Sequence, residues 1–241
     1  MINTNLEHSS TFQPITLQIP TLQLIFQFPL RPHQIGQWRG AVCQSAGWEK
    51  DAFHNHRGGD KHQYHYRYPL IQYRTHRGLA SVLGVGAGSQ ALRQWILSAP
   101  PAVQLGQQLQ PLTLHQIKDH LQPVSMHPDW QTYYIHQYLP FNGDNYQRWK
   151  NKANLIEGIE LLQKVLVGHL LNFATGIDWE IPEHLTVEIM EPPIVQKVKH
   201  YQTARMAFDL CFKTNMQLPR GIGIGKGCSH GFGVVRPFRQ K

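Results

Sequence analysis

The alternation of apolar and polar residues predicts two successive sets of strands and helices. In the first set, residues 15–30 alternate and then become mainly apolar, which indicates a strand. Pro32 suits the first turn of a helix that runs through Trp38 to about residue 46. The pattern then predicts a loop at 47–65, strands at 66–74 and 79–85, a helix at 89–97 and a strand at 109–117. This β-α-β-β-α-β order is typical of a ferredoxin-like fold.

The second set has the same order with one exception. A strand at 132–139 precedes a long helical segment at 145–174, and further strands are predicted at 185–190 and 204–212. Residues 216–230, where a second helix would belong, are too rich in glycine to be helical, and residues 231–238 supply the last strand. We therefore expect an α+β protein of two tandem ferredoxin-like (RRM-like) domains, at 1–122 and 123–241. Their boundary is expected within 120–129, which contains two prolines.

The composition indicates a basic protein without disulfides. The 241 residues carry a formal net charge of +8, and 15 histidines add charge near a polyanion, which suits a nucleic-acid or anionic-surface partner. Cys43, Cys211 and Cys228 are far apart in sequence and form no C-x-x-C pair, so neither a disulfide framework nor a cysteine zinc site is indicated. No signal peptide is recognised at the N-terminus, and no apolar run reaches the roughly 18 residues of a membrane helix. A soluble, cytoplasmic protein with no membrane partner is expected.

The most informative segment is a glycine-rich stretch near the C-terminus. Two Gly-apolar-Gly triplets, at 223–225 and 231–233, flank a lysine and a histidine. Closely spaced glycines permit positive φ and let backbone N–H groups approach a ligand, and successive N–H groups can form an anion nest. The segment therefore predicts phosphate binding by Gly223, Gly225, Lys226, Ser229, His230, Gly231 and Gly233.

Two familiar nucleotide-binding loops do not fit this segment. A Walker A loop needs a glycine where Arg220 stands and a serine or threonine where Gly227 stands. A dinucleotide fingerprint built on the first triplet needs a glycine at Cys228. Both loops also open a helix, whereas this segment leads into a terminal strand.

The glycine-rich pattern resembles the C-terminal loop of the repeat-associated RNA-binding superfamily of CRISPR systems. Within it, the chain is most similar to the CRISPR-associated endoribonuclease that cuts precursor CRISPR RNA. The resemblance extends to Tyr201-Gln-Thr-Ala, to the apolar strand from Met206, and to the strand and helix order near the N-terminus. It implies precursor CRISPR RNA as the partner, and leaves other effector subunits and a homodimer open. It also implies cleavage without metal or cofactor, in which 2′-OH attack leaves a 2′,3′-cyclic phosphate and a 5′-OH.

The same resemblance implies the catalytic residues. The family commonly has a histidine just after the first helix and a lysine a few residues later, which His54, His56 and Lys61 match. Histidine suits proton transfer because its pKa lies near neutrality, and which of the two histidines acts stays open. Arg39 and Arg57 are expected to extend the RNA-binding surface.

Several alternatives stay open at this point. The histidine-rich segment can instead be a solvated surface, or it can bind zinc through His54, His56, His62 and Cys43. His230 is either an RNA contact or a second catalytic group. Residues 64–74 mix aromatic residues with cations, which suits base stacking as well as a buried strand face. At the level of function, the alternatives are a non-catalytic RNA-binding subunit of a CRISPR effector complex and an unrelated phosphate-binding protein.

Overall fold

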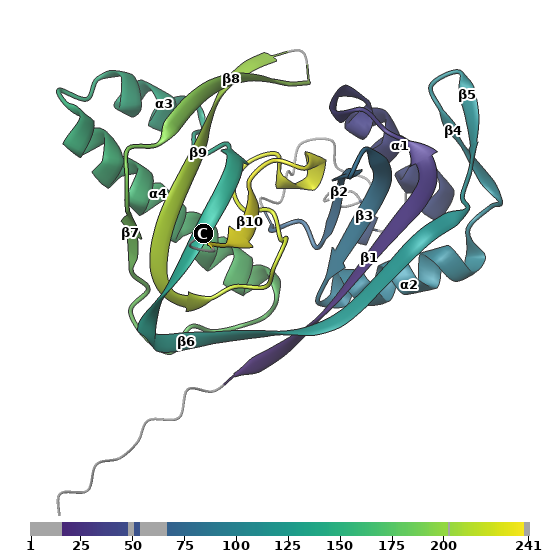
Figure 1. Ribbon diagram of the computed structural model, residues 1–241, viewed down its shortest axis with the longest axis horizontal. Helices are drawn as coiled ribbons and strands as arrows, with labels where there is room; N and C mark the ends of the chain where they lie inside the picture. The colour runs from purple at the N-terminus through teal and green to yellow at the C-terminus, as the bar shows by residue number, and fades with distance from the viewer. Residues whose placement is uncertain (1–15, 48–50, 54–66, 202, 239–241) are drawn as a thin grey trace, which may run out of the picture.

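The computed structural model describes residues 16–47, 51–53, 67–201 and 203–238. Its strands are β1 (Leu17–Pro29), β2 (Ile71–His76), β3 (Leu79–Val85), β4 (Ala102–Leu105), β5 (Gln108–Pro111), β6 (Leu114–Tyr138), β7 (Val187–Ile189), β8 (Ile194–His200), β9 (Thr203–Gln217) and β10 (Val234–Pro237). Eight of them form one sheet in the order β2-β3-β1-β6-β9-β7, with β10 on β6 and β8 on β9, while β4 and β5 form a separate hairpin (Figure 1). The expected α+β class is confirmed.

The N-terminal unit consists of strands in the order β6-β1-β3-β2. A short 3-10 helix, η1 (Pro32–Gln34), leads from β1 into α1 (Ile35–Ala46), and α2 (Ala87–Ser98) follows β3. The helices pack on the strands through aromatic rings, with the centroid of Phe26 5.2 Å from that of Trp38 and 6.2 Å from that of Trp95. Strand order and helix positions are those of a ferredoxin-like unit, as predicted.

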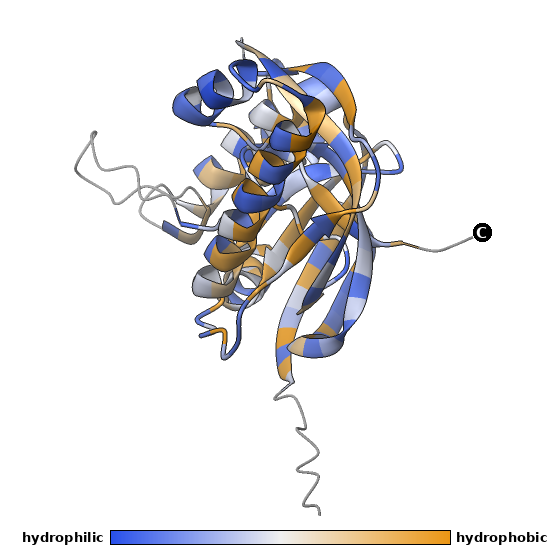
Figure 2. Cartoon of the chain, turned by 90° about the vertical axis from the view of Figure 1, so that its left-hand side faces the viewer, coloured by the Kyte–Doolittle hydropathy of each residue, from blue (hydrophilic) through white to orange (hydrophobic). Residues whose placement is uncertain are grey.

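The C-terminal unit has strand order β10-β6-β9 with β7 and β8 beyond β9, and its helices are α3 (Gly143–Lys150) and α4 (Leu155–Gly176). Asn142 caps α3 and Asn154 caps α4, each by accepting a backbone N–H bond. The single helix predicted at 145–174 is therefore two helices, the second of which starts at the Asn154 cap. Figure 2 shows the helices gathered on one side of the strands. The second helix of a ferredoxin-like unit is replaced by the glycine-rich segment, which contains only the short 3-10 helix η3 (Cys228–His230).

The strand predicted at 109–117 is wrong. Residues 108–111 belong to the β4–β5 hairpin, and β6 begins at Leu114 and continues to Tyr138. The first part of β6 pairs with β1 and the second part with β9, so one strand serves both units. Pro128 falls in the register shift between Met126 and Gln131, where the ladder is interrupted and no N–H donor is required. The prolines at 120–129 therefore lie within a strand, and the domain boundary at 122/123 stays a prediction.

Two further expectations concern the cysteines and the helices. Cys43, Cys211 and Cys228 are all buried and free, which confirms that they form no disulfide. None of the helices in the described part of the chain combines the length and apolar character needed to cross a bilayer.

Candidate functional site

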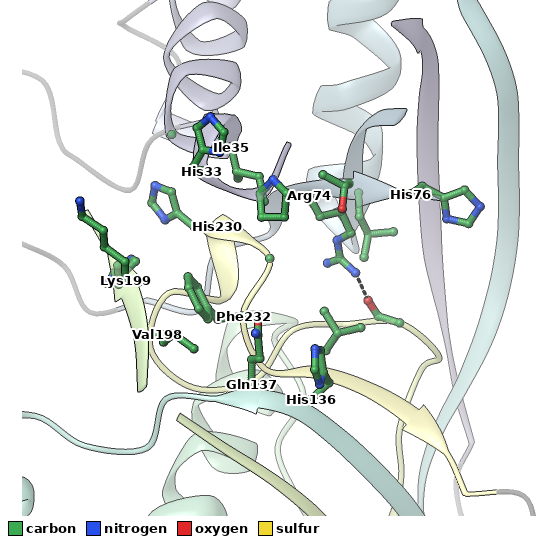
Figure 3. Close-up of a pocket in the computed structure, with 18 of the residues that line it drawn as sticks. His33, Ile35, Arg74, His76, His136, Gln137, Val198, Lys199, His230 and Phe232 are labelled. Atoms are coloured by element: carbon green, nitrogen blue, oxygen red, sulfur yellow. Dashed lines mark hydrogen bonds between the residues drawn. The ribbon is translucent and has the colours of Figure 1, made fainter. Parts of the chain in front are cut away.

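A cleft of about 1440 Å³ lies between the two units (Figure 3). The N-terminal unit lines it with β1, the start of α1 and the end of β2, and the C-terminal unit with β6, the end of β8 and the glycine-rich segment. Because strands from both units meet here, the cleft depends on the long shared strand β6 and on the contact of η3 with β2 and α1. Figure 1 shows the glycine-rich segment, in yellow, between the two units.

The lining of the cleft is basic. Neither aspartate nor glutamate is found among its described lining residues. The basic side chains there are Arg74, Lys199, Arg220, Arg236, His33, His76, His136, His200 and His230. A concave surface with charge of one sign focuses its field on the space inside, so the cleft suits a polyanion.

Arg74 is a buried cation in this lining. Its side chain is 8% exposed, and its guanidinium donates to the backbone oxygen of Gly221 and to the side-chain oxygen of Gln72. Its buried Nε has no hydrogen-bond partner among the described residues. Burial lowers the pKa of Arg74 to about 10. Since burying an unpaired charge is costly and no carboxylate is found among the described lining residues, an anion from outside the chain would offset that cost.

His76 and Lys118 form a second basic pair beside Arg74. Lys118 Nζ lies 3.3 Å from His76 Nε2, joining β2 to β6. Burial, followed by the charge of Lys118, lowers the pKa of His76. A neutral imidazole therefore accepts a bond from the ammonium, and a bound anion would favour both groups in their charged forms. Sequence reasoning missed this pair because no local pattern joins positions that are 42 residues apart.

Asp209 on β9 positions the part of β6 that faces the cleft. Its carboxylate accepts the backbone N–H of Gln137 at 2.6 Å and the hydroxyl of Tyr134 at 3.0 Å, and lies 3.0 Å from His136 Nδ1. Gln137 has φ +48°, an uncommon conformation for a residue other than glycine. The carboxylate thus stabilises a strained turn of β6 that carries His136 and Gln137 into the cleft (Figure 3).

The glycine-rich segment is held by hydrogen bonds within the protein. The N–H of Gly223 donates to Gln72 Oε1 at 2.8 Å, and that of Gly233 donates to the carbonyl of Gln137 at 3.1 Å. Gly231 donates to the carbonyl of Cys228 at 3.3 Å. Each of these three N–H groups already has a protein acceptor, so the predicted anion nest would have to use other N–H groups of the segment. Phosphate contacts of the segment stay a prediction that rests on its side chains and its other N–H groups.

The glycines allow close packing and left-handed backbone instead. A Cβ at Gly225, where φ is +88°, would lie 2.5 Å from the ring of Tyr138. A Cβ at Gly233, where φ is +63°, would lie 1.9 Å from the carbonyl oxygen of Ile224. Real Cβ atoms do not approach so closely, so only glycine fits at either position.

Lys226 is not among the residues that line the cleft. Its backbone N–H donates to the carbonyl of Leu139 at 3.0 Å, and burial lowers the pKa of its side chain. The nearby His169 on α4 has its pKa lowered to about 4, first by burial and then by the charge of Lys226. The phosphate contact expected of Lys226 stays a prediction.

His230 lies in the cleft together with other predicted residues. Its Nε2 is 3.0 Å from the hydroxyl of Tyr201, and its Nδ1 is 3.1 Å from Ser229 Oγ. Burial, then the charges of Arg39 and His200, lowers the pKa of His230 to about 3. The structure thus brings Arg39, Ser229 and His230 into one neighbourhood, with His230 neutral at neutral pH.

The predicted residues His54, His56, Arg57 and Lys61 lie outside the described residues. The segment that precedes them ends in η2 (Asp51–Phe53), where the carbonyl of Phe53 accepts a bond from the Tyr73 hydroxyl at 3.1 Å.

The zinc alternative depends largely on residues outside the described part of the chain, so it stays open. Its remaining member, Cys43, is 1% exposed, and its thiol donates to the carbonyl of Phe53 at 3.2 Å. In the described part of the chain no group of three or more potential ligands is placed to hold a metal ion.

The described aromatic residues of 64–74 belong to the core. Tyr68 is 3% exposed and Tyr73 is fully buried. Their hydroxyls are bonded to Gln72 and to Phe53, respectively. Base stacking by these two residues is therefore excluded. The alternative of a buried strand face is confirmed for Tyr73 on β2, whereas Tyr68 is buried in the segment that precedes this strand.

Comparison with known proteins gives consistent matches along the chain. Residues 16–122 match the family model of the Cas6b N-terminal domain, and residues 125–238 match that of the Cas6b C-terminal domain. A crystal structure of Cas6b has a TM-score of 0.78 at 22% identity, and a CRISPR RNA processing endoribonuclease Cas6b has 0.70 at 19% identity. Each comparison covers 92% of this chain and 100% of the other. An uncharacterised protein of Methanocaldococcus jannaschii is 31% identical over 103 residues, covering 42% of this chain and 68% of that protein.

Proposed function

Because the chain belongs to the Cas6b family, we propose that it is an endoribonuclease that cuts precursor CRISPR RNA within the repeats. Family membership confirms the resemblance to the CRISPR-associated endoribonuclease inferred from the glycine-rich segment. A solved member of the family is described as a CRISPR RNA processing endoribonuclease. The observation in this chain that carries the proposal is the cleft lined by histidine, lysine and arginine, with no carboxylate among its described lining residues.

The proposed reaction needs a base, a cation and an acid, and no cofactor. One of His54 and His56 takes the proton from a ribose 2′-OH, whose oxygen attacks the adjacent phosphorus. The bond from phosphorus to the 5′-oxygen breaks, and a protonated group supplies a proton to that oxygen. Lys61 and Arg39 stabilise the charge that develops on the phosphate. The products are a 2′,3′-cyclic phosphate and a 5′-OH.

Strand β2 contacts both Phe53, the last described residue before the proposed catalytic segment, and the glycine-rich segment. The residue that precedes His54, Phe53, is bonded to Tyr73 on β2. The side chain of Gln72, the neighbouring residue on β2, binds Gly223. Because successive side chains of a strand point to opposite faces, these two contacts are made on the two sides of β2.

Phosphates of the RNA backbone are proposed to bind along the N-terminal wall of the cleft. The buried guanidinium of Arg74, with its unpaired Nε, and the pair of His76 and Lys118 offer donors on β2 and β6. Contacts of this kind orient an RNA without reading its sequence.

The decisive experiment incubates the protein with the repeat RNA of its host's CRISPR array in EDTA. We expect cleavage at one position, with a cyclic phosphate on one product. A 2′-deoxy substitution at the scissile nucleotide removes the attacking oxygen and should abolish cleavage. Cleavage of the deoxy RNA, or a strict need for a divalent ion, would contradict the mechanism. Tight binding without cleavage would favour the non-catalytic subunit.

A further inference from the structure

Four rings gather at the rim of the cleft, where the turn between β8 and β9 meets the glycine-rich segment. The centroid of His200 lies 4.7 Å from that of Tyr201, 5.4 Å from that of His230 and 5.3 Å from that of Phe232. The centroids of Tyr201 and His230 are 5.0 Å apart. Figure 3 shows His230 and Phe232 of this ring cluster next to Lys199. The proposed reaction gives these rings no role as a group.

Tyr201 has a conformation that its side chain does not favour. His200 pairs with Thr203, so Tyr201 occupies the first position of a tight hairpin turn. Its φ is +54°, in the left-handed region where glycine, asparagine and aspartate are preferred. Its side chain is also 65% exposed. The turn favours other residue types and the side chain is not part of the core, so neither explains why this position is a tyrosine. Residues with a strained backbone of this kind cluster at ligand-binding sites.

Hydrogen bonds hold the ring of Tyr201 in place. Its hydroxyl bonds to His230 Nε2 at 3.0 Å, and His230 Nδ1 in turn lies 3.1 Å from Ser229 Oγ. The polar edge of the tyrosine is thus satisfied by the protein, while much of the ring stays open to solvent. Because the tyrosine side chain is already held in place, the protein loses little conformational freedom when a ligand stacks on the ring.

The surroundings supply cations beside the rings. Lys199 lines the cleft one strand position from His200. Arg205 is close enough to His200 to lower its pKa further, after the larger effect of burial, so this ring is neutral at neutral pH. Neutral rings next to lysine and arginine are the composition with which proteins bind single-stranded RNA, because every base has a face to stack and a phosphate beside it.

We propose that the ring cluster is a stacking site for one unpaired base of the repeat RNA, with Tyr201 as the stacking residue and Lys199 as the contact for the adjoining phosphate. This inference rests on the proposed function and adds to it a base-binding subsite. Such a site distinguishes unpaired from paired nucleotides, since a base within a duplex has no free face.

The test is an abasic scan of the repeat RNA. Each nucleotide is replaced in turn by an abasic one, and the affinity is measured for the parent protein, Tyr201→Ala, Tyr201→Phe and the control Tyr146→Ala, which removes an exposed tyrosine of α3. In the parent and the control, one position should cost about 5- to 100-fold in affinity. In Tyr201→Ala the same position should cost less than about 2-fold, because the stacking partner is already absent. Tyr201→Phe keeps the ring and should retain the parent's profile.

A stability measurement separates stacking from a structural role. Tyr201→Asn should raise the midpoint of thermal unfolding by about 1 to 3 °C, because asparagine tolerates positive φ, while weakening RNA binding as much as Tyr201→Ala. A lower midpoint in Tyr201→Asn would assign the tyrosine to folding and overturn the inference.

The outcomes also separate this inference from the proposed function. An abasic profile that is the same in the parent and in Tyr201→Ala would overturn the stacking site, while cleavage of that RNA by the parent would leave the proposed function intact. A parent protein that neither binds nor cleaves repeat RNA would overturn both.

Discussion

The two ferredoxin-like units differ at the position of their second helix, and this difference produces the site. In the N-terminal unit, α2 packs on β3 of its own sheet and buries Trp95. In the C-terminal unit, the corresponding segment has no long helix, and its η3 packs against β2 and α1 of the other unit. A helix satisfies its own backbone and completes one core, whereas an irregular segment must find partners outside itself. Here those partners include Gln72 and Gln137, one from each unit.

The largest effect should come from breaking the close packing of the glycine-rich segment. Gly233→Ala places a Cβ 1.9 Å from a backbone oxygen, and should lower the free energy of unfolding by about 3 kcal/mol or more. Gly78→Ala is the matched control, because Gly78 also has positive φ (+82°) but a Cβ there meets nothing within 4 Å. It should cost only about 1 kcal/mol. Urea unfolding measures both, and equal losses would show that φ alone explains the glycines.

The next effect concerns the catalytic histidines of the N-terminal unit. Replacing His54 and His56 together with alanine should slow single-turnover cleavage by about 10²-fold or more, because the proton acceptor is lost. Affinity for repeat RNA should change little. Lys61→Ala should lower the rate less. Parent rates in the double variant would move proton transfer to the C-terminal unit, where His230 is the next candidate.

A pH titration should detect the buried His169 of the C-terminal unit. The pKa of His169 is lowered to about 4 in the folded state, against about 6.5 in the unfolded chain. The unfolded chain therefore binds the proton more readily, so the stabilisation is full above about pH 6.5 and is lost as pH falls towards 4. Between pH 7 and 5, the parent should lose about 1 to 2 kcal/mol more stability than His169→Gln. Urea unfolding at each pH measures this difference.

The smallest effect compares one lysine from each side of the molecule. Lys118→Ala removes the partner of His76 at the N-terminal wall of the cleft and should reduce the salt dependence of RNA binding by about one phosphate contact, or about 0.7 in the log–log slope. Lys226→Ala tests the phosphate contact predicted for the glycine-rich segment in the same way. If Lys226→Ala reduced the slope and Lys118→Ala did not, the RNA phosphates would be assigned to the glycine-rich segment and not to β2 and β6.

Elements with a buried face were predictable from sequence, and exposed ones were not. The strand expected at 79–85 is β3, with the same bounds, because most of its residues are buried between β1 and β2. The edge strand β8 was missed because its residues are mostly exposed and polar, so no alternation of apolar positions marks it. The prediction of the site was limited in the same way, because it too depended on patterns between neighbouring residues. His230 and the glycines were predicted from their spacing. Arg74 belongs to the stretch at 64–74 whose cations and aromatic residues were noted, but nothing in the sequence indicated that its side chain is buried.

The sequence by itself determined the α+β class, the order of the elements with a buried face, the absence of disulfides and, through the glycine-rich pattern, the family. Those properties depend on backbone preferences and on the spacing of apolar residues, both of which can be read from short stretches of sequence. Only the tertiary structure decided that Arg74 is buried, with Gly221 and Gln72 as its described hydrogen-bond partners, that Gly223 donates to Gln72, and that Tyr201 reaches His230. Gln72 and Gly223 are 151 residues apart in the chain. Whether a polar group meets a protein partner or awaits a ligand depends on such distant pairings, because the free energy of a buried polar group is set by the atoms around it and not by its sequence neighbours.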